Sequence, residues 1–160
     1  FVGENHPGDY GAALLRAIKA SSDDKAIITG WTDPETYCLY LAAADMAVQL
    51  RTDTRGETSA AALDCLTWGL PLIVNANGAL AELPADAVVA LADAFDLGDL
   101  TAAIDGLASN PSRGALLAER LTSADLVGIA HEIGLSETLP AAERMLAGQM
   151  TGRYVVDVNR

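Results

Sequence analysis

The stretch RGETSAAALDCLTWGLPLIV, residues 55–74, decides the fold of this 160-residue chain. It joins a polar, glycine-containing turn to an alanine-rich segment, which predicts a helix over residues 57–68. Gly69 suits the left-handed position that follows a helix, and Pro71 prevents the helix from continuing. Residues 72–75 then predict a buried strand. A helix that leads into a buried strand is the repeating unit of a layered α/β fold.

The same alternation continues on both sides of this stretch. We expect strands at residues 1–3, 26–29, 46–50 and 87–91, and helices at 9–20, 34–44, 97–107, 112–121 and 139–149. Asp33 and Pro34 mark a helix start, because Asp caps the first turn and Pro fits the first helical position. Residues 76–81 read as a loop, and 151–160 as a short strand or a disordered tail. The pattern predicts a Rossmann-like, doubly wound parallel sheet with extra C-terminal helices.

The amino-acid composition limits which partners and which kinds of site are expected. Hydrophobic residues make up 51% of the chain and aromatic residues 5%, which predicts an aliphatic core. The formal net charge of -12 argues against nucleic acid or an anionic membrane as partner. Cys38, Cys65, His6 and His131 stand apart in the sequence, so we expect two reduced thiols and no metal site. The chain begins with Phe1, and we interpret it as a piece of a longer protein.

Ligands of parallel α/β sheets bind at the carboxyl ends of the strands. Glu57 and Asp64 are seven positions apart, so on one helix they would differ by about 20° around the axis and lie about 10 Å apart along it. Such carboxylates suit sugar hydroxyls, and the free N–H groups of Thr58, Ser59 and Ala60 suit a diphosphate. The plainer alternatives are that Glu57 complements the helix dipole, that Asp64 is solvated, and that Thr58 and Ser59 cap the helix.

The whole run resembles the retaining GT-B glycosyltransferases of group 1 (family 4). Their C-terminal domain carries a Glu, seven residues and a second Glu, then Ala-x-Ala-x-Gly-x-Pro-Val-Val and a Gly-Gly-x-x-Glu loop. The matching segments here are DCLTWGLPLI at 64–73 and GALAE at 78–82, with ITGW at 28–31 and LAAAD at 41–45 upstream. The resemblance implies a nucleotide-sugar-binding domain over residues 1–121, a helical extension and tail over 122–160, and an N-terminal acceptor domain outside this sequence.

The resemblance also implies roles. Asp64 would bind the ribose, Glu57 would be the catalytic residue at the donor sugar, and the backbone around Trp31 would hold the base. For Trp31 the alternative is a ring that covers the sheet edge, and for Glu82 it is a cap or loop carboxylate. The donor-binding set is Gly30, Trp31, Gly56, Thr58, Ser59, Ala60, Asp64, Gly78 and Glu82.

Two departures from the family pattern bear on these roles. Six residues, not seven, separate Glu57 from Asp64. Either Gly56 stands where the family has its first Glu, or this sequence has lost one residue between the two carboxylates. The family's Arg and Lys that neutralise the leaving diphosphate lie upstream of a strand like residues 1–3, outside this sequence. Arg51 and Arg55 are nearby cations, for which the alternative is a pair of solvated loop side chains.

The function implied is retaining glycosyl transfer from a nucleotide-diphospho-sugar, such as a UDP or GDP sugar, to a saccharide, lipid or other acceptor. It requires no cofactor or metal, and we expect this chain alone to be inactive. The alternatives are a non-catalytic GT-B-like nucleotide-binding or interaction module and, last, a dinucleotide-binding domain, for which a G-x-G-x-x-G is lacking. We expect a cytoplasmic protein, held at the inner membrane surface if the rest of the chain binds there. Leu139, Met145 and Leu146 predict an apolar face that pairs two copies.

Overall fold

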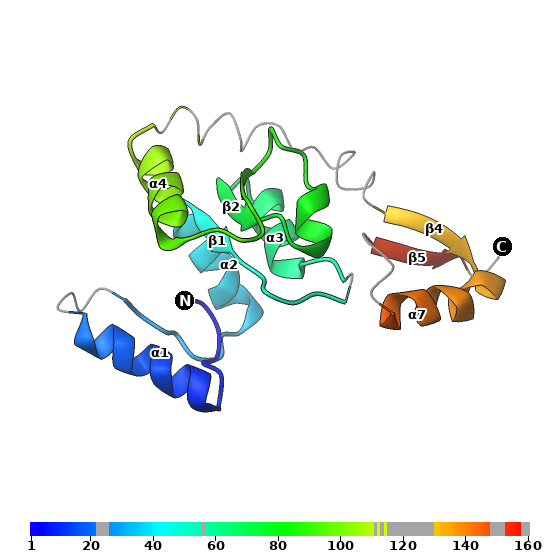
Figure 1. Ribbon diagram of the computed structural model, residues 1–160, viewed down its shortest axis with the longest axis horizontal. Helices are drawn as coiled ribbons and strands as arrows, with labels where there is room; N and C mark the ends of the chain where they lie inside the picture. Colours follow the sequence, from blue (N-terminus) through cyan, green and yellow to red (C-terminus); the bar gives the residue numbers. More distant parts are fainter. Residues whose placement is uncertain are drawn as a thin grey trace. The chain divides into compact units, whose positions relative to one another are not determined.

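The computed structural model describes residues 1–21, 26–55, 57–110, 112, 114, 130–147 and 153–157 (Figure 1). Contacts divide the chain into two units, residues 1–43 and 44–160. Among the described residues, no helix combines the length and the hydrophobicity that a membrane span requires.

A parallel three-stranded sheet organises the second unit. Its strands β1 (Ala47–Gln49), β2 (Leu72–Asn75) and β3 (Val89–Leu91) lie in the order β1-β2-β3. Every residue of β2 is buried, as expected for a central strand covered on both faces. The predicted strand at 72–75 is therefore confirmed with the same bounds, and the strands predicted at 46–50 and 87–91 are present but shorter.

Helices cover this sheet. Helix α3 (Ala60–Thr67) connects β1 to β2, and α4 (Leu97–Ala108) follows β3. Figure 1 shows the sheet between α4 and α3. Ile73 of β2 and Leu107 of α4 form a core that is completed by Met46, Val89, Leu91, Leu100, Ala103 and Ile104. The predicted Rossmann-like α/β fold with a parallel sheet is confirmed.

Turns and caps fix the ends of these elements. Gly69 has φ of 68°, the left-handed conformation expected after α3. Asp96 and Asp99 form a reciprocal capping box at the start of α4. The loop predicted at 76–81 is wrong in part, because Gly78–Glu82 forms the short 3₁₀ helix η1. Its first residue, Gly78, has φ of 55°.

The first unit holds two of the predicted helices. Helix α1 (Asp9–Ala20) has the predicted bounds, and α2 (Pro34–Ala43) begins as predicted and ends one residue earlier. The Asp33 carboxylate accepts hydrogen bonds from the backbone N–H of Thr36, at 2.9 Å, and from its hydroxyl, at 2.7 Å. These bonds hold the pKa of Asp33 below its ordinary value.

The strands predicted at residues 1–3 and 26–29 are wrong. The two segments run beside each other, with the Phe1 amino group bonded to the Ile27 carbonyl at 2.8 Å and the Thr29 N–H to the Phe1 carbonyl at 3.1 Å. Only an isolated bridge joins Gly3 to Gly30, and Ile27 is 66% exposed. Two short segments paired only with each other bury too little apolar area to make a stable strand pair.

The C-terminal part of the second unit is a small βαβ arrangement. Strand β4 (Ala130–Gly134) leads through the 3₁₀ helix η2 (Leu135–Glu137) and helix α7 (Thr138–Leu146) to β5 (Arg153–Asp157). β4 pairs with β5 in parallel, Ala130 opposite Arg153. The predicted helix 139–149 is present as α7, and the short strand expected within 151–160 is β5, whereas β4 was not predicted. Most of the predicted helix 112–121 lies outside the described residues.

Candidate functional site

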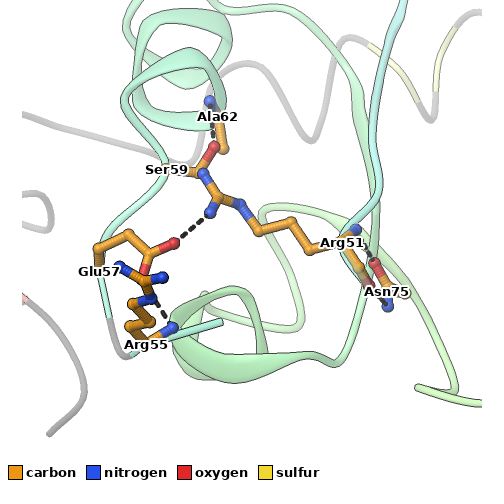
Figure 2. A network of polar contacts seen from close by, with 6 residues as sticks. All are labelled: Arg51, Arg55, Glu57, Ser59, Ala62 and Asn75. Atoms are coloured by element: carbon orange, nitrogen blue, oxygen red, sulfur yellow. Dashed lines mark hydrogen bonds and ion pairs between the residues drawn. The ribbon is translucent and has the colours of Figure 1, made fainter. Parts of the chain in front are cut away.

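The loop that follows β1 carries an ion pair at the carboxyl edge of the sheet. Arg51 Nη1 lies 2.7 Å from Glu57 Oε1, and the backbone N–H of Arg55 donates to Glu57 Oε2 at 2.8 Å. Figure 2 shows the Arg51 side chain reaching across to Glu57. Hydrogen bonds from the backbone N–H groups of Glu57 and Arg55, with the Arg51 charge adding to them, hold the pKa of Glu57 below its ordinary value. Glu57 is therefore an ionised carboxylate with both oxygens engaged.

Helix α3 begins at Ala60, so the prediction of a helix from Glu57 is wrong. The bonds to Glu57 hold that residue in the loop, and Ser59 has the extended conformation of an N-cap, with φ of -80° and ψ of 105°. Glu57 and Asp64 consequently do not share a helix face. Asp64 alone lies on α3, where it is half-buried.

The residues at the start of α3 combine a cap with an unbonded hydroxyl. The Ser59 hydroxyl accepts from the Ala62 N–H at 3.3 Å (Figure 2), which confirms the capping alternative for this residue. Ser59 is only 3% exposed, whereas Ala60, the first helical residue, is exposed. Thr58 Oγ1 is buried and has no hydrogen-bond partner in the part of the chain that the structure describes. Such an orphaned buried hydroxyl is uncommon and suits a ligand atom.

Cys65 follows Asp64 on the buried side of α3. Burial, with the neighbouring Asp64 charge as a lesser cause, raises the pKa of the Cys65 thiol. Cys65 is 3% exposed and is a free thiol, as is the half-buried Cys38. Among the described residues, no three His, Cys, Asp or Glu side chains gather as a metal ion would require.

Asn75, the last residue of β2, joins this edge of the sheet and was not among the predicted site residues. Its side-chain oxygen accepts from the Arg51 N–H at 2.8 Å, and its amide nitrogen donates to the Arg51 carbonyl at 2.7 Å (Figure 2). The same nitrogen lies 3.1 Å from Asp93 Oδ1, after β3. The available signal was a polar residue that ends an otherwise apolar buried strand.

Further loop contacts join the same edge of the sheet. Asn77 donates to Asp93 Oδ1 at 2.9 Å, so both asparagines converge on one carboxylate oxygen. Gly78 approaches Thr54 so closely that a Cβ at Gly78 would lie 2.5 Å from the Thr54 side chain. Glu82 is exposed at the end of η1. Contacts at Arg51 and Thr54 thus join the loop after β1 to Asn75 and Gly78.

Two of the expected base-binding residues lie in the first unit, and one expected phosphate-binding residue lies outside the described part. Gly30 has φ of 73°, and Trp31 is 73% exposed. Gly56 is outside the described residues.

Comparison with known proteins supports the fold assignment. No protein-family model matches the chain, and no curated protein matches it. A solved structure, sucrose-phosphate synthase from Thermosynechococcus elongatus, superposes with a TM-score of 0.61 at 21% sequence identity. The match covers 74% of this chain and 31% of that one, so the chain spans about a third of the synthase's length. This likeness shows that the chain shares the fold of the matched part of the synthase.

Proposed function

We propose that this chain is the donor-binding part of a glycosyltransferase and binds a nucleotide-diphospho-sugar at the carboxyl edge of the β1-β2-β3 sheet. The observation that carries the proposal is the start of α3. There the exposed Ala60, the unbonded Thr58 hydroxyl and the Arg51 guanidinium follow one another around a single loop. A helix N-terminus with added donors is a favourable place for a diphosphate.

In this proposal each group has a chemical task. The first N–H groups of α3 have no partner within the helix, and they would donate to the phosphate oxygens together with Thr58 Oγ1. Arg51 would supply the positive charge, since a guanidinium binds phosphate in a bidentate manner. Asp64 would accept hydrogen bonds from the ribose hydroxyls. Gly56, Gly78 and Glu82 would complete the donor site.

The proposed reaction is transfer of the sugar with retention of configuration. Its transition state is cationic at the sugar and anionic at the departing phosphate, and fixed donors at α3 would stabilise the latter. Arg51 and Glu57 carry the two complementary charges within one loop. Glu57, which is already ionised, would face the sugar once Arg51 turns to the phosphate. The acceptor would be held by an N-terminal domain outside this sequence, so we expect nucleotide binding without turnover from this chain alone.

Calorimetric titration with UDP, GDP, ADP and NAD tests the proposal. We expect one nucleoside diphosphate to bind selectively, and Asp64→Asn to weaken its binding by about tenfold or more, because a hydrogen bond to a charged group is lost. Asp105→Asn, which removes an exposed carboxylate on α4, is the matched control and should bind as the unaltered chain does. Binding of NAD in place of any nucleoside diphosphate would contradict the proposal.

A second candidate function is a non-catalytic nucleotide-binding or interaction module. The observation in its favour is that both Glu57 oxygens are engaged within the loop, by Arg51 and by backbone N–H groups. The full-length protein distinguishes the two candidates. Hydrolysis or transfer of a radiolabelled UDP or GDP sugar that is lost in Glu57→Gln supports the enzyme, whereas nucleotide binding without any turnover supports the module.

A further inference from the structure

Asn75 makes contacts that a strand backbone would otherwise make. It is 1% exposed, and its side-chain amide exchanges two hydrogen bonds with the Arg51 backbone, at 2.8 Å and 2.7 Å. Two bonds exchanged with one residue are the pattern of an antiparallel pair, and here a side chain makes them two residues beyond the end of the parallel strand β1. The amide therefore extends the pairing of β1 with β2 by means of a side chain.

A buried amide in this position is expensive to remove. Without it, the N–H and C=O groups of Arg51 would lose their partners at the sheet edge, and a buried backbone group without a partner costs free energy comparable to a lost hydrogen bond. Asp93, which faces the same amide from the loop after β3, would also lose a donor. The backbone at Arg51 therefore has one strongly preferred position. This position determines where the Arg51 side chain begins and which groups its guanidinium can reach.

We propose that Asn75 is a positioning residue whose buried amide fixes the backbone of Arg51 and thereby aims its guanidinium at Glu57 ahead of α3. Two sets of contacts connect Asn75 to Glu57. Asn75 forms hydrogen bonds with the Arg51 backbone, and Arg51 Nη1 forms an ion pair with Glu57 Oε1 at 2.7 Å. Figure 2 shows both ends of the Arg51 residue held in this way. The consequence for a bound diphosphate rests on the proposed function, but the aiming of Arg51 does not.

The first test measures the pKa of Glu57, because a merely structural role for Asn75 would leave the pKa of Glu57 unchanged. Carbon-detected NMR follows the Glu57 carboxyl through an acid titration in the unaltered chain, Asn75→Ala, Arg51→Met and Ile73→Val. We expect Asn75→Ala to raise the pKa of Glu57 by most of the rise that Arg51→Met produces. Ile73→Val shortens another fully buried side chain of β2 and should leave it unchanged. An unchanged pKa in a folded Asn75→Ala protein would overturn the proposal.

A measurement on the unaltered chain covers the case in which Asn75→Ala does not fold. Hydrogen exchange of the Arg51 N–H should be as slow as that of amides within β2, because its acceptor is a buried side chain. Exchange at the rate of the exposed loop residues Thr52 and Asp53 would show that Asn75 does not hold this backbone, and the proposal would fail.

Nucleotide titration separates this inference from the proposed function. If the unaltered chain binds UDP or GDP, Asn75→Ala should weaken binding about as much as Arg51→Met, by about tenfold. Equal binding by Asn75→Ala and the unaltered chain would contradict the positioning role at the ligand. If the unaltered chain binds no nucleotide, the proposed function fails, and the Glu57 titration and Arg51 exchange still decide the role of Asn75.

Discussion

Replacement of Gly78 by alanine tests how tightly the two site loops are fitted together. Gly78 has φ of 55°, in the left-handed region, and a Cβ there would lie 2.5 Å from both Thr54 Cγ2 and Thr54 Oγ1. Ordinary van der Waals contacts of a Cβ begin near 3.4 Å. The 51–59 loop would therefore have to move away from η1 to admit one methyl group.

Two separate costs add up in this substitution. The left-handed conformation costs about 1–2 kcal/mol for a residue with a Cβ. Forcing a methyl group into a filled space costs about 1–3 kcal/mol more. We expect Gly78→Ala to lower the free energy of unfolding by about 2–5 kcal/mol in the unaltered background. In a Thr54→Gly background the contact is gone, so only the conformational cost of about 1–2 kcal/mol should remain.

Urea denaturation of the four proteins of this double-mutant cycle measures the difference. Trp31 is exposed and lies in the other unit, so all four proteins carry Trp31→Phe. The fluorescence of Trp68, at the end of α3, then reports the unfolding of the unit that contains Thr54 and Gly78. A coupling energy of about 1–3 kcal/mol is expected between positions 54 and 78. An equal cost of Gly78→Ala in both backgrounds would show that the loops are not in contact and would refute the reasoning.

Three further predictions concern single residues. The pKa of Glu57 in the folded protein lies below its ordinary value of 4.5, so its stabilising contribution is fully present above pH 4.5 and is lost as pH falls through the folded pKa. The difference in unfolding free energy between the unaltered chain and Glu57→Gln should accordingly be constant above pH 4.5 and shrink below it, as urea melts at several pH values would show. Ser59→Ala removes the cap of α3 and should cost about 1 kcal/mol in the same melts, whereas Ser59→Asp should cost much less. Cys65 is buried with a raised pKa, so a disulfide reagent at pH 8 should modify Cys38 first and Cys65 only on unfolding, and equal rates in the folded protein would contradict its burial.

The sequence predicts well those elements whose signals are local. The run of apolar residues before Asn75 and the Gly69–Pro71 punctuation define β2, and the bounds of α1 follow from its apolar spacing. These features need no knowledge of distant residues, because helix stops and buried strands are encoded within a few positions. The prediction that a ligand binds at the carboxyl edge also follows from the order of elements alone.

Long-range contacts account for what the sequence does not predict. The start of α3 moves from 57 to 60 because Arg51 and the Arg55 N–H hold Glu57 in the loop. Asn75 gains its role only when β1 lies beside β2. β4 has a short, mixed sequence and depends on pairing with β5, so periodicity within either segment is too weak to define it.

The order of the strands in the sheet has a consequence for how this chain reaches its fold. Ala47 pairs with Leu72 and Ile73 pairs with Val89, so each neighbouring strand is supplied by the next segment of about 25 residues or fewer. The entropy lost on closing such short connections is small, and low sequence separation favours fast folding. A ribosome would release β1, β2 and β3 in the order in which they assemble, so the loops that meet at Asn75 can close before the residues beyond α4 have left the ribosome.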